Sequence, residues 1–233
     1  MDLDAAADDA FQAALTSAVA AGPAGERALL AALAATSKED RFSDLVAALG
    51  EADGPDGSAV LGDIALRPGM SAGVRRCALI ALAKRAGVAA TDVYARALAD
   101  PDDEVRGGAL LVLASAGDDR ARAAVLAELR RLLELSSPHP LLDMQEHALS
   151  SLSKTLSAVC YLGRHAAGSE TRQRAVTALV RPRWDRLYGA EQRWLTAYWP
   201  ACDPARPEAF NELDPTWLAD WVSRPLFNAR FQR

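Results

Sequence analysis

The sequence has few cysteines, few aromatic side chains and no long apolar run, and each shortage excludes a class of protein. Its three cysteines, Cys77, Cys160 and Cys202, are far apart and odd in number. They suit neither a disulfide framework nor a clustered metal site, and they indicate a reducing, cytoplasmic setting. No apolar run approaches the roughly 18 residues that span a bilayer, and the N-terminus is acidic where a signal peptide is basic. We therefore expect a protein that is neither exported nor embedded in a membrane.

The chain also lacks the signatures of the common enzyme classes. It contains no G-x-G-x-x-G, P-loop, G-x-S-x-G or H-E-x-x-H motif. The glycine-rich stretch at 54–58 has no lysine and follows no strand, so we interpret it as a loop between helices. The three histidines, His139, His147 and His165, are interpreted as surface or structural side chains. The sequence indicates no catalytic residue, no metal ligand and no cofactor.

The cysteines differ in their surroundings. Cys77 and Cys160 lie on apolar helix faces, where we expect buried, inert thiols. Cys202 lies in a proline-rich turn that leaves room for an exposed thiol, but no base is found near it.

What the sequence has in abundance is alanine, leucine and arginine, while β-branched residues are sparse. These residues lose little on entering a helix, so the sequence predicts an all-α protein. Apolar residues recur at three- and four-residue spacing in short segments that end at Gly, Pro or Asp/Ser clusters. We predict helices at 3–20, 24–35, 40–49, 58–66, 72–86, 91–99, 102–116, 120–135, 142–165, 170–180, 190–198 and 216–222.

Two of these segments are related to each other. Val74–Gly87 matches Val105–Gly117 at an offset of 31 residues and shares Val, Arg, Ala, Leu, Leu and Ala with it. Weaker copies begin at Met144 and Thr171, and a faint one at Glu26. A repeated unit of this length predicts a stack of similar helix pairs.

The repeat resembles a known family. Leu98–Leu113 resembles the HEAT repeat, particularly the short bacterial form that is also seen in phycobilin lyase subunits. The resemblance implies a right-handed α-solenoid of about five to six HEAT-like helix pairs in a single domain, 1–233. Within it we distinguish acidic N-terminal helices at 1–70, clear repeats at 71–136 and divergent helices at 137–233. The second helix of each pair lines the concave face, which is the default binding surface.

The repeats assign structural roles to Arg75, Asp100, Pro101, Val105 and Arg106. We expect Asp100 to cap the following helix and Pro101 to take its first position. Val105 begins a buried stripe with Ala109, Leu110 and Leu113. The resemblance implies that Arg106, and Arg75 at the matching position, connect neighbouring repeats through hydrogen bonds to Asp or carbonyl groups.

Residues 164–199 differ from the repeats because arginines alternate with aromatic side chains. The candidate partner-binding residues there are Arg181, Arg183, Trp184, Arg186, Tyr188, Arg193 and Trp194. Rings can stack on bases or anchor an interface, and guanidinium groups pair with phosphate or carboxylate. The alternative is structural: Trp194 with Tyr198, and Trp217 with Trp221, are each spaced four residues apart, as on the core face of terminal helices.

The distribution of charge bears on whether the partner is a nucleic acid or a protein. The net charge is −5, and residues 1–70 carry 12 acidic and 4 basic side chains. Residues 160–233 carry 11 basic and 8 acidic ones. This weak basicity disfavours nucleic acid, so the leading hypothesis is a non-enzymatic scaffold that binds a protein partner through its concave face.

Two alternatives belong to other classes. Alkylation-repair DNA glycosylases also use HEAT-like repeats, and the candidate pair here would be Trp184 and Asp185. The second alternative is an accessory subunit of a tetrapyrrole-attaching lyase, which only the repeat supports.

Overall fold

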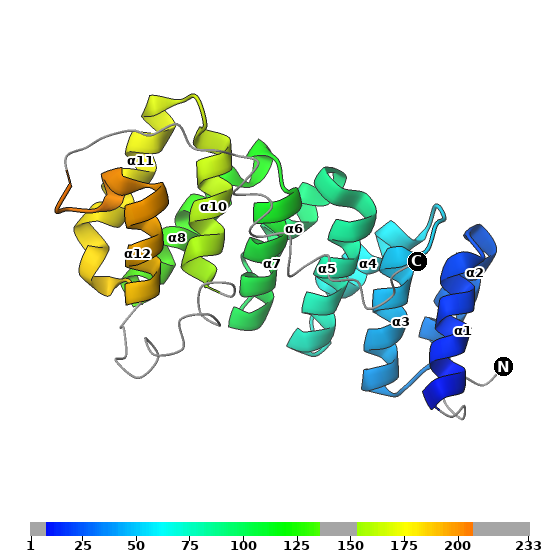
Figure 1. The fold of residues 1–233 in the computed structure, drawn as a ribbon. Helices are drawn as coiled ribbons and strands as arrows, with labels where there is room; N and C mark the ends of the chain where they lie inside the picture. Colours follow the sequence, from blue (N-terminus) through cyan, green and yellow to red (C-terminus); the bar gives the residue numbers. More distant parts are fainter. Residues whose placement is uncertain (1–7, 136–152, 207–233) are drawn as a thin grey trace. The chain divides into compact units, whose positions relative to one another are not determined.

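The computed structural model describes residues 8–135 and 153–206. Within these ranges the chain is helical and contains no strand, which confirms the predicted all-α class. The α-helices, drawn in Figure 1, are α1 (Asp8–Ala20), α2 (Pro23–Ala35), α3 (Glu39–Glu51), α4 (Gly57–Ala65), α5 (Ala72–Ala86), α6 (Thr91–Ala97), α7 (Asp103–Ala116), α8 (Arg122–Leu135), α10 (Lys154–Ala166), α11 (Glu170–Val180) and α12 (Gly189–Tyr198). Short 3-10 helices occupy Gly87–Ala90, Asp119–Ala121, Arg181–Arg186 and Pro200–Cys202.

Most predicted helix boundaries agree with the structure to within a few residues, but the helix predicted over 142–165 is wrong. Ser153 has an extended backbone, with φ −61° and ψ 121°, and its side chain accepts a hydrogen bond from the Leu156 amide. Serine is a preferred N-cap residue, so α10 begins at Lys154. The helix predicted at 216–222 with Trp217 and Trp221, the repeat copy at Met144, and His139 and His147 lie outside the described residues.

The chain divides into two compact units whose boundary falls between Val112 and Leu113, inside α7. Among the described residues, unit 1 comprises 8–112, and unit 2 comprises 113–135 and 153–206. The expectation of one continuous domain stays a prediction.

In unit 1, α5 packs against both α3 and α4, and α1 packs against α2 and α3. The contact between α3 and α5 is close because Gly50 has no side chain. A Cβ atom at Gly50 would lie 2.7 Å from the Cα atom of Ala81. The predicted stripe of Val105, Ala109 and Leu110 is fully buried.

A buried ion pair connects four helices of unit 1. Arg85, near the end of α5, forms an ion pair with Glu26 of α2, and the Glu26 side chain is fully buried. Arg85 also donates to the backbone oxygens of Leu49 at 2.8 Å, of Ala52, and of Gly54 at 2.5 Å, where α3 ends. The Glu26 carboxylate accepts the backbone N–H of Gly57, the first residue of α4, at 2.6 Å. Since helix ends expose unpaired carbonyl and amide groups, one ion pair satisfies an end of α3 and an end of α4.

Unit 2 contains a comparable arginine. Here α10 packs against α8 and α11. Arg164 of α10 donates to the backbone oxygens of Leu113 at 3.1 Å, Ser115 at 3.0 Å and Gly117, at the end of α7. Its side-chain neighbour is His165, with 3.2 Å between Arg164 Nη2 and His165 Nε2. In both units, an arginine near the end of one helix thus donates to the carbonyl oxygens at the end of an earlier helix, an arrangement that is not predicted from the sequence.

Candidate functional site

Unit 1 has a groove on the predicted second-helix face. The groove has a volume of about 270 Å³ and lies over α3, α5 and the start of α7. Its lining residues are Ala47, Glu51, Gly73, Arg76, Cys77, Ile80, Ala81, Lys84 and Glu104. The volume lies just below the range for small-molecule pockets, about 300–1,000 Å³, and suits an inserted side chain better than a cofactor.

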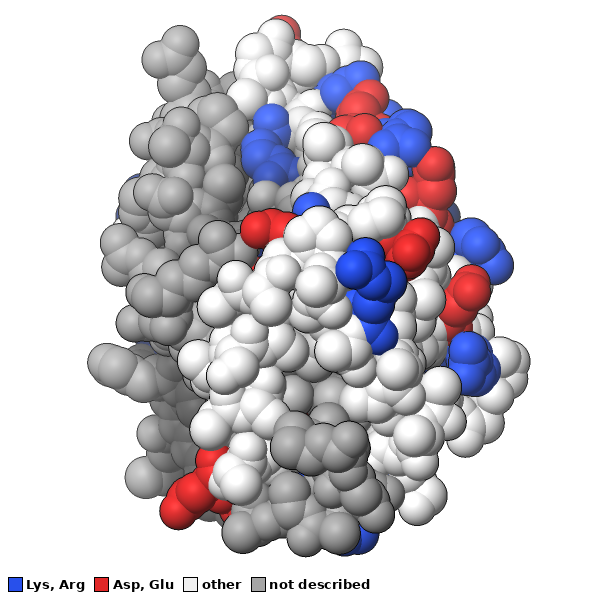
Figure 2. Space-filling model, turned by 90° about the vertical axis from the view of Figure 1, so that its right-hand side faces the viewer, with Lys and Arg blue, Asp and Glu red and all other residues white. Residues whose placement is uncertain are grey.

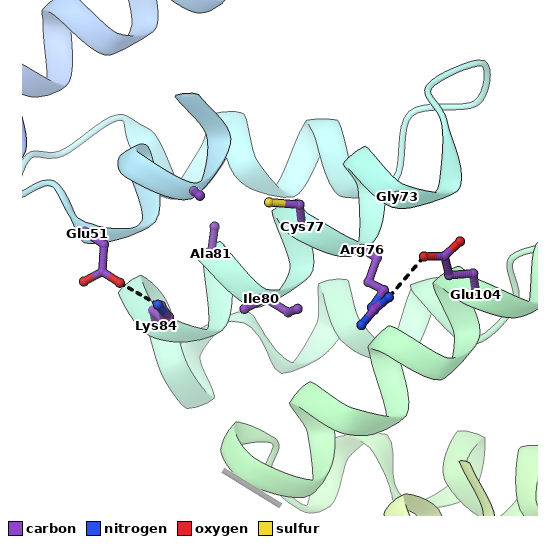
Figure 3. Close-up of a pocket in the computed structure, with 9 residues that line it drawn as sticks. Glu51, Gly73, Arg76, Cys77, Ile80, Ala81, Lys84 and Glu104 are labelled. Atoms are coloured by element: carbon purple, nitrogen blue, oxygen red, sulfur yellow. Dashed lines mark hydrogen bonds and ion pairs between the residues drawn. The ribbon is translucent and has the colours of Figure 1, made fainter. Parts of the chain in front are cut away.

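An ion pair lies at each end of the groove (Figure 3). At one end Lys84 Nζ lies 2.6 Å from Glu51 Oε1, and these side chains are only 17% and 20% exposed. At the other end Arg76 Nη1 lies 3.1 Å from Glu104 Oε1, with 41% and 49% exposed. Ile80 is half-buried between the two pairs. The groove therefore combines an apolar floor with one closed and one open polar end.

Small residues hollow out this surface. Gly108 of α7 lies against Arg76, because a Cβ atom at Gly108 would come within 2.9 Å of Arg76 Cγ. The absence of that atom lets the arginine lie across α7 toward Glu104. Gly73, Cys77 and Ala81 follow one another at four-residue spacing on α5, so no large side chain fills the space beside Ile80.

Neither the repeat nor the composition of the sequence indicates this groove. A signal was present, since Arg76, Ile80 and Lys84 are spaced four residues apart and share one face of α5. Their carboxylate partners come from α3 and α7, however, and that arrangement depends on the tertiary packing.

The five residues given repeat-structural roles lie around the start of α7. Arg75 forms an ion pair with Asp100 and donates to the Ala65 oxygen at 3.4 Å, so it connects α4, α5 and the segment before α7. Arg106 donates to the backbone oxygens of Asp100 at 2.6 Å and Pro101 at 2.8 Å and pairs with Asp103. These bonds of Arg106 lie within its own repeat.

The expected cap at Asp100 is wrong in position. The helix α7 begins at Asp103, and the Glu104 amide donates to Asp102 Oδ1 at 2.8 Å. Asp102 therefore caps the helix, and Pro101 precedes its first turn. Asp100 lies before the helix, where its Oδ1 accepts the Asp102 amide at 2.9 Å and its Oδ2 pairs with the buried Arg75.

Three of the four arginines predicted to bind a partner in unit 2 donate to the chain's own backbone. Arg181 donates to the oxygens of Ala201 at 3.0 Å, Pro204 at 3.2 Å and Arg206 at 3.1 Å. Arg186 donates to Glu134 O at 2.6 Å, and Arg183 donates to Leu179 O at 3.2 Å. In these bonds the guanidinium groups hold turns and helix ends in place.

The aromatic residues of the same set are divided between core and surface. Trp194 is buried, and its ring lies 5.2 Å from that of Tyr198, which is 44% exposed. The Tyr188 amide donates to Glu191, a buried carboxylate whose pKa is raised by burial. Trp184 and Arg193 line a second, shallower hollow with Gln192, Thr196, Asp203 and Arg206. Asp185, the glycosylase-like candidate, is exposed on the 3-10 helix.

The cysteines and the histidine among the described residues are buried or half-buried. Cys160 and Cys202 are buried, so the exposed thiol considered for Cys202 is wrong, and burial raises the pKa of Cys202 to about 12. Cys77 is half-buried in the groove rather than fully buried. Burial lowers the pKa of His165. Among residues 8–135 and 153–206, no group of three His, Cys, Asp or Glu side chains could hold a metal ion.

No protein-family model, no curated protein and no solved structure matches the chain. Within the part of the chain that the structure describes, no helix is both long and apolar enough to cross a membrane. The HEAT resemblance therefore rests on the repeated residues alone.

Proposed function

We propose that the chain is a non-enzymatic interaction protein of the cytoplasm, built as a right-handed HEAT-like solenoid of about five to six helix pairs. It binds another protein through the face of α3, α5 and α7. The observation that carries this proposal is the groove around Ile80, an apolar hollow on second helices of successive predicted pairs. Stacked second helices form the usual binding surface of such repeats.

The charges support a protein partner rather than nucleic acid. The groove carries two acidic and two basic side chains, and unit 1 has 15 acidic and 10 basic residues. On the face shown in Figure 2, acidic and basic side chains are interspersed and form no field of one sign. Nucleic-acid binding depends on a basic surface, which neither observation provides.

The arginine-rich segment gives little support to the glycosylase alternative. Its guanidinium groups at Arg181 and Arg186 are engaged with backbone oxygens, which makes them poor phosphate ligands. No observation favours a lyase subunit.

Affinity capture from the native host tests the proposed function. We expect the wild-type protein to retain a discrete partner protein and Ile80→Glu to lose it, because a buried carboxylate in the groove would be costly. Arg96→Glu, on the exposed surface of α6, is the matched control and should retain the partner. Capture that is unaffected by Ile80→Glu, or that recovers nucleic acid instead of protein, would contradict the proposal.

A further inference from the structure

In unit 2, the contact between the end of α7 and the end of α10 depends on one arginine. Arg164 of α10 donates to three backbone oxygens where α7 ends, those of Leu113 at 3.1 Å, Ser115 at 3.0 Å and Gly117. The last carbonyl groups of a helix lack donors within the helix, so the guanidinium group replaces the missing backbone N–H groups. Arg164 therefore fastens α10 to the end of α7. These contacts are called the α7–α10 junction.

The junction requires a neutral histidine beside the arginine. Arg164 Nη2 lies 3.2 Å from His165 Nε2. A guanidinium group has only donors, so the ring nitrogen has to accept the hydrogen bond. An imidazolium ring carries an N–H on both nitrogens and cannot accept. Protonation of His165 would replace this hydrogen bond by two positive charges in contact.

The carboxylates around His165 are already paired with arginines. Asp119 accepts from both terminal nitrogens of Arg172 at 2.9 Å, and Asp118 pairs with Arg120 at 3.0 Å. Arg172 of α11 also donates to the His165 backbone oxygen at 2.8 Å. A charged imidazole would therefore meet carboxylates that each balance another cation. Of the described residues, the titratable and charged groups around the ring are Tyr161 and Arg164 of α10, Asp118, Asp119 and Arg120 before α8, Arg122 at the start of α8, and Arg172 of α11.

The imidazole ring is open to protons but is held in place by its neighbour. His165 is half-buried, and its ring centre lies 4.5 Å from that of Tyr161. Tyr161 is fully buried and donates to the backbone oxygen of Asp118 at 2.5 Å. Burial is the main cause that lowers the pKa of His165, followed by the charge of Arg164. The neutral ring therefore predominates at neutral pH.

We propose that protonation of His165 opens the α7–α10 junction of unit 2, because the charged ring displaces Arg164 from the carbonyl oxygens at the end of α7. Arg164 moves because its side chain is long and flexible, whereas the ring packs against Tyr161. The junction is a pH-operated switch that opens as the pH falls through the folded-state pKa, which lies below 6.5. It does not depend on the proposed interaction function.

Hydrogen exchange of the full-length protein, followed by mass spectrometry, tests the switch. Exchange rates at pH 8 and pH 5.5 are each divided by the intrinsic rate of unstructured peptides at that pH. At pH 5.5, peptides that contain Leu113–Gly117 or Tyr161–His165 should lose about threefold to tenfold of their protection. Peptides from α3 and α5 in unit 1 should keep theirs and serve as the internal reference.

Three variants assign the effect to the proposed contact. In His165→Gln the amide oxygen can still accept from Arg164 but cannot be protonated, so the loss of protection at pH 5.5 should disappear. His147→Gln removes one of the other two histidines and should respond as the wild type does. Arg164→Met should show the low protection already at pH 8. Should Arg164→Met fail to fold, the comparison of the two histidine variants decides the result.

Glu191 is a second group of unit 2 that titrates closer to neutral pH, since burial raises its pKa. Its protonation is favoured in the folded chain, so it stabilises the fold as the pH falls. It would therefore act against the expected loss of protection.

Two kinds of result would overturn the proposal. One is a loss of protection that persists in His165→Gln or is absent from His147→Gln, or no loss in the wild type. The other is full protection at the end of α7 at a pH where the NMR signals of His165 show a charged ring. The ring would then have moved away and left Arg164 in place.

Discussion

Arg85 in unit 1 and Arg164 in unit 2 occupy similar positions but have different neighbours. Each lies in the last turn of one helix and donates to carbonyl oxygens where an earlier helix ends. Arg85 is balanced by the buried carboxylate of Glu26. Arg164 instead contacts the imidazole of His165 and lies 5.9 Å from the ring centre of Tyr161.

The difference shows that the same pattern of arginine-to-carbonyl bonds can depend on a buried counter-charge in one unit and on the protonation of a histidine in the other. The Glu26–Arg85 pair contains two opposite charges, and removing either leaves the other buried without a counter-charge. Arg164 has a neutral neighbour, because a guanidinium group only donates and the 3.2 Å contact requires His165 Nε2 to accept. The unit 1 pair is therefore sensitive to substitution, and the unit 2 pair is sensitive to pH.

The largest effect is expected from Arg85→Met. It leaves the Glu26 carboxylate buried and unpaired, so we expect the free energy of unfolding to fall by about 3–5 kcal/mol. Urea denaturation measures this loss. The double variant Glu26→Gln/Arg85→Met removes the stranded charge and should recover part of the stability. A single variant that loses less than about 1 kcal/mol would show that the pair is not critical.

Arg164→Met should have a smaller effect. It removes hydrogen bonds to three carbonyl oxygens but strands no carboxylate, so we expect a loss of about 1–3 kcal/mol in the same assay. Arg174→Met is the control, because Arg174 pairs with Glu170 of the same helix on an exposed surface. That pair should contribute about 0–1 kcal/mol. Equal losses in the two variants would contradict the capping role of Arg164.

The pH dependence of unit 2 should be smaller still. Burial is the main cause of the lowered pKa of His165, and Arg164 and Arg172 lower it further while Asp119 opposes them. Because the pKa is lower in the folded than in the unfolded chain, the neutral form favours folding. The stabilisation is present above the usual value of 6.5 and is lost as the pH falls through the folded pKa.

The His165→Gln variant isolates this contribution. Thermal unfolding from pH 8 to 5 should show a shallower pH dependence for the variant than for the wild type. If the unfolding temperature depends on pH equally in the variant and the wild type, the protonation of His165 does not contribute to the pH dependence of stability.

The smallest effect on stability is expected at the groove. Ile80 is half-buried and lies outside both arginine networks, so Ile80→Glu should change the free energy of unfolding by at most about 0.5–1 kcal/mol. Circular dichroism during urea titration measures this. A large loss of unfolding free energy would mean that Ile80 is part of the core. Any loss of partner binding by Ile80→Glu would then reflect unfolding and not the groove.

The sequence was sufficient for the helices because their signals are local. Alanine-rich periodicity and breakers such as Gly87 and Gly168 determine where helices end, and Glu170–Val180 was predicted to the residue. Ser153 could have been read as a cap, but the apolar spacing continues through it. Asp100 resembles a helix cap in the sequence because Asp is a preferred N-cap residue. Its ion pair with Arg75, 25 positions away in the chain, leaves no local signal that would have corrected this prediction.

The candidate site was predicted less well for the same reason. The arginine and aromatic residues around Trp184 stand out in composition. The backbone oxygens that accept hydrogen bonds from Arg181 and Arg186, however, cannot be predicted from the sequence. The groove residues, by contrast, do not stand out in the sequence. Ala47, Cys77 and Ala81 are common in helices, and they form the groove because their small side chains leave space between α3 and α5.

Site-specific photo-crosslinking in the native host tests most directly whether the groove in unit 1 is the interaction surface. A benzophenone amino acid is placed at Ile80 in one sample and at Trp184 in another, and the adducts are identified by mass spectrometry. We predict a discrete partner-protein adduct at Ile80 and none at Trp184. An adduct at Trp184 alone, or an Ile80 adduct with another part of this chain, would contradict the account.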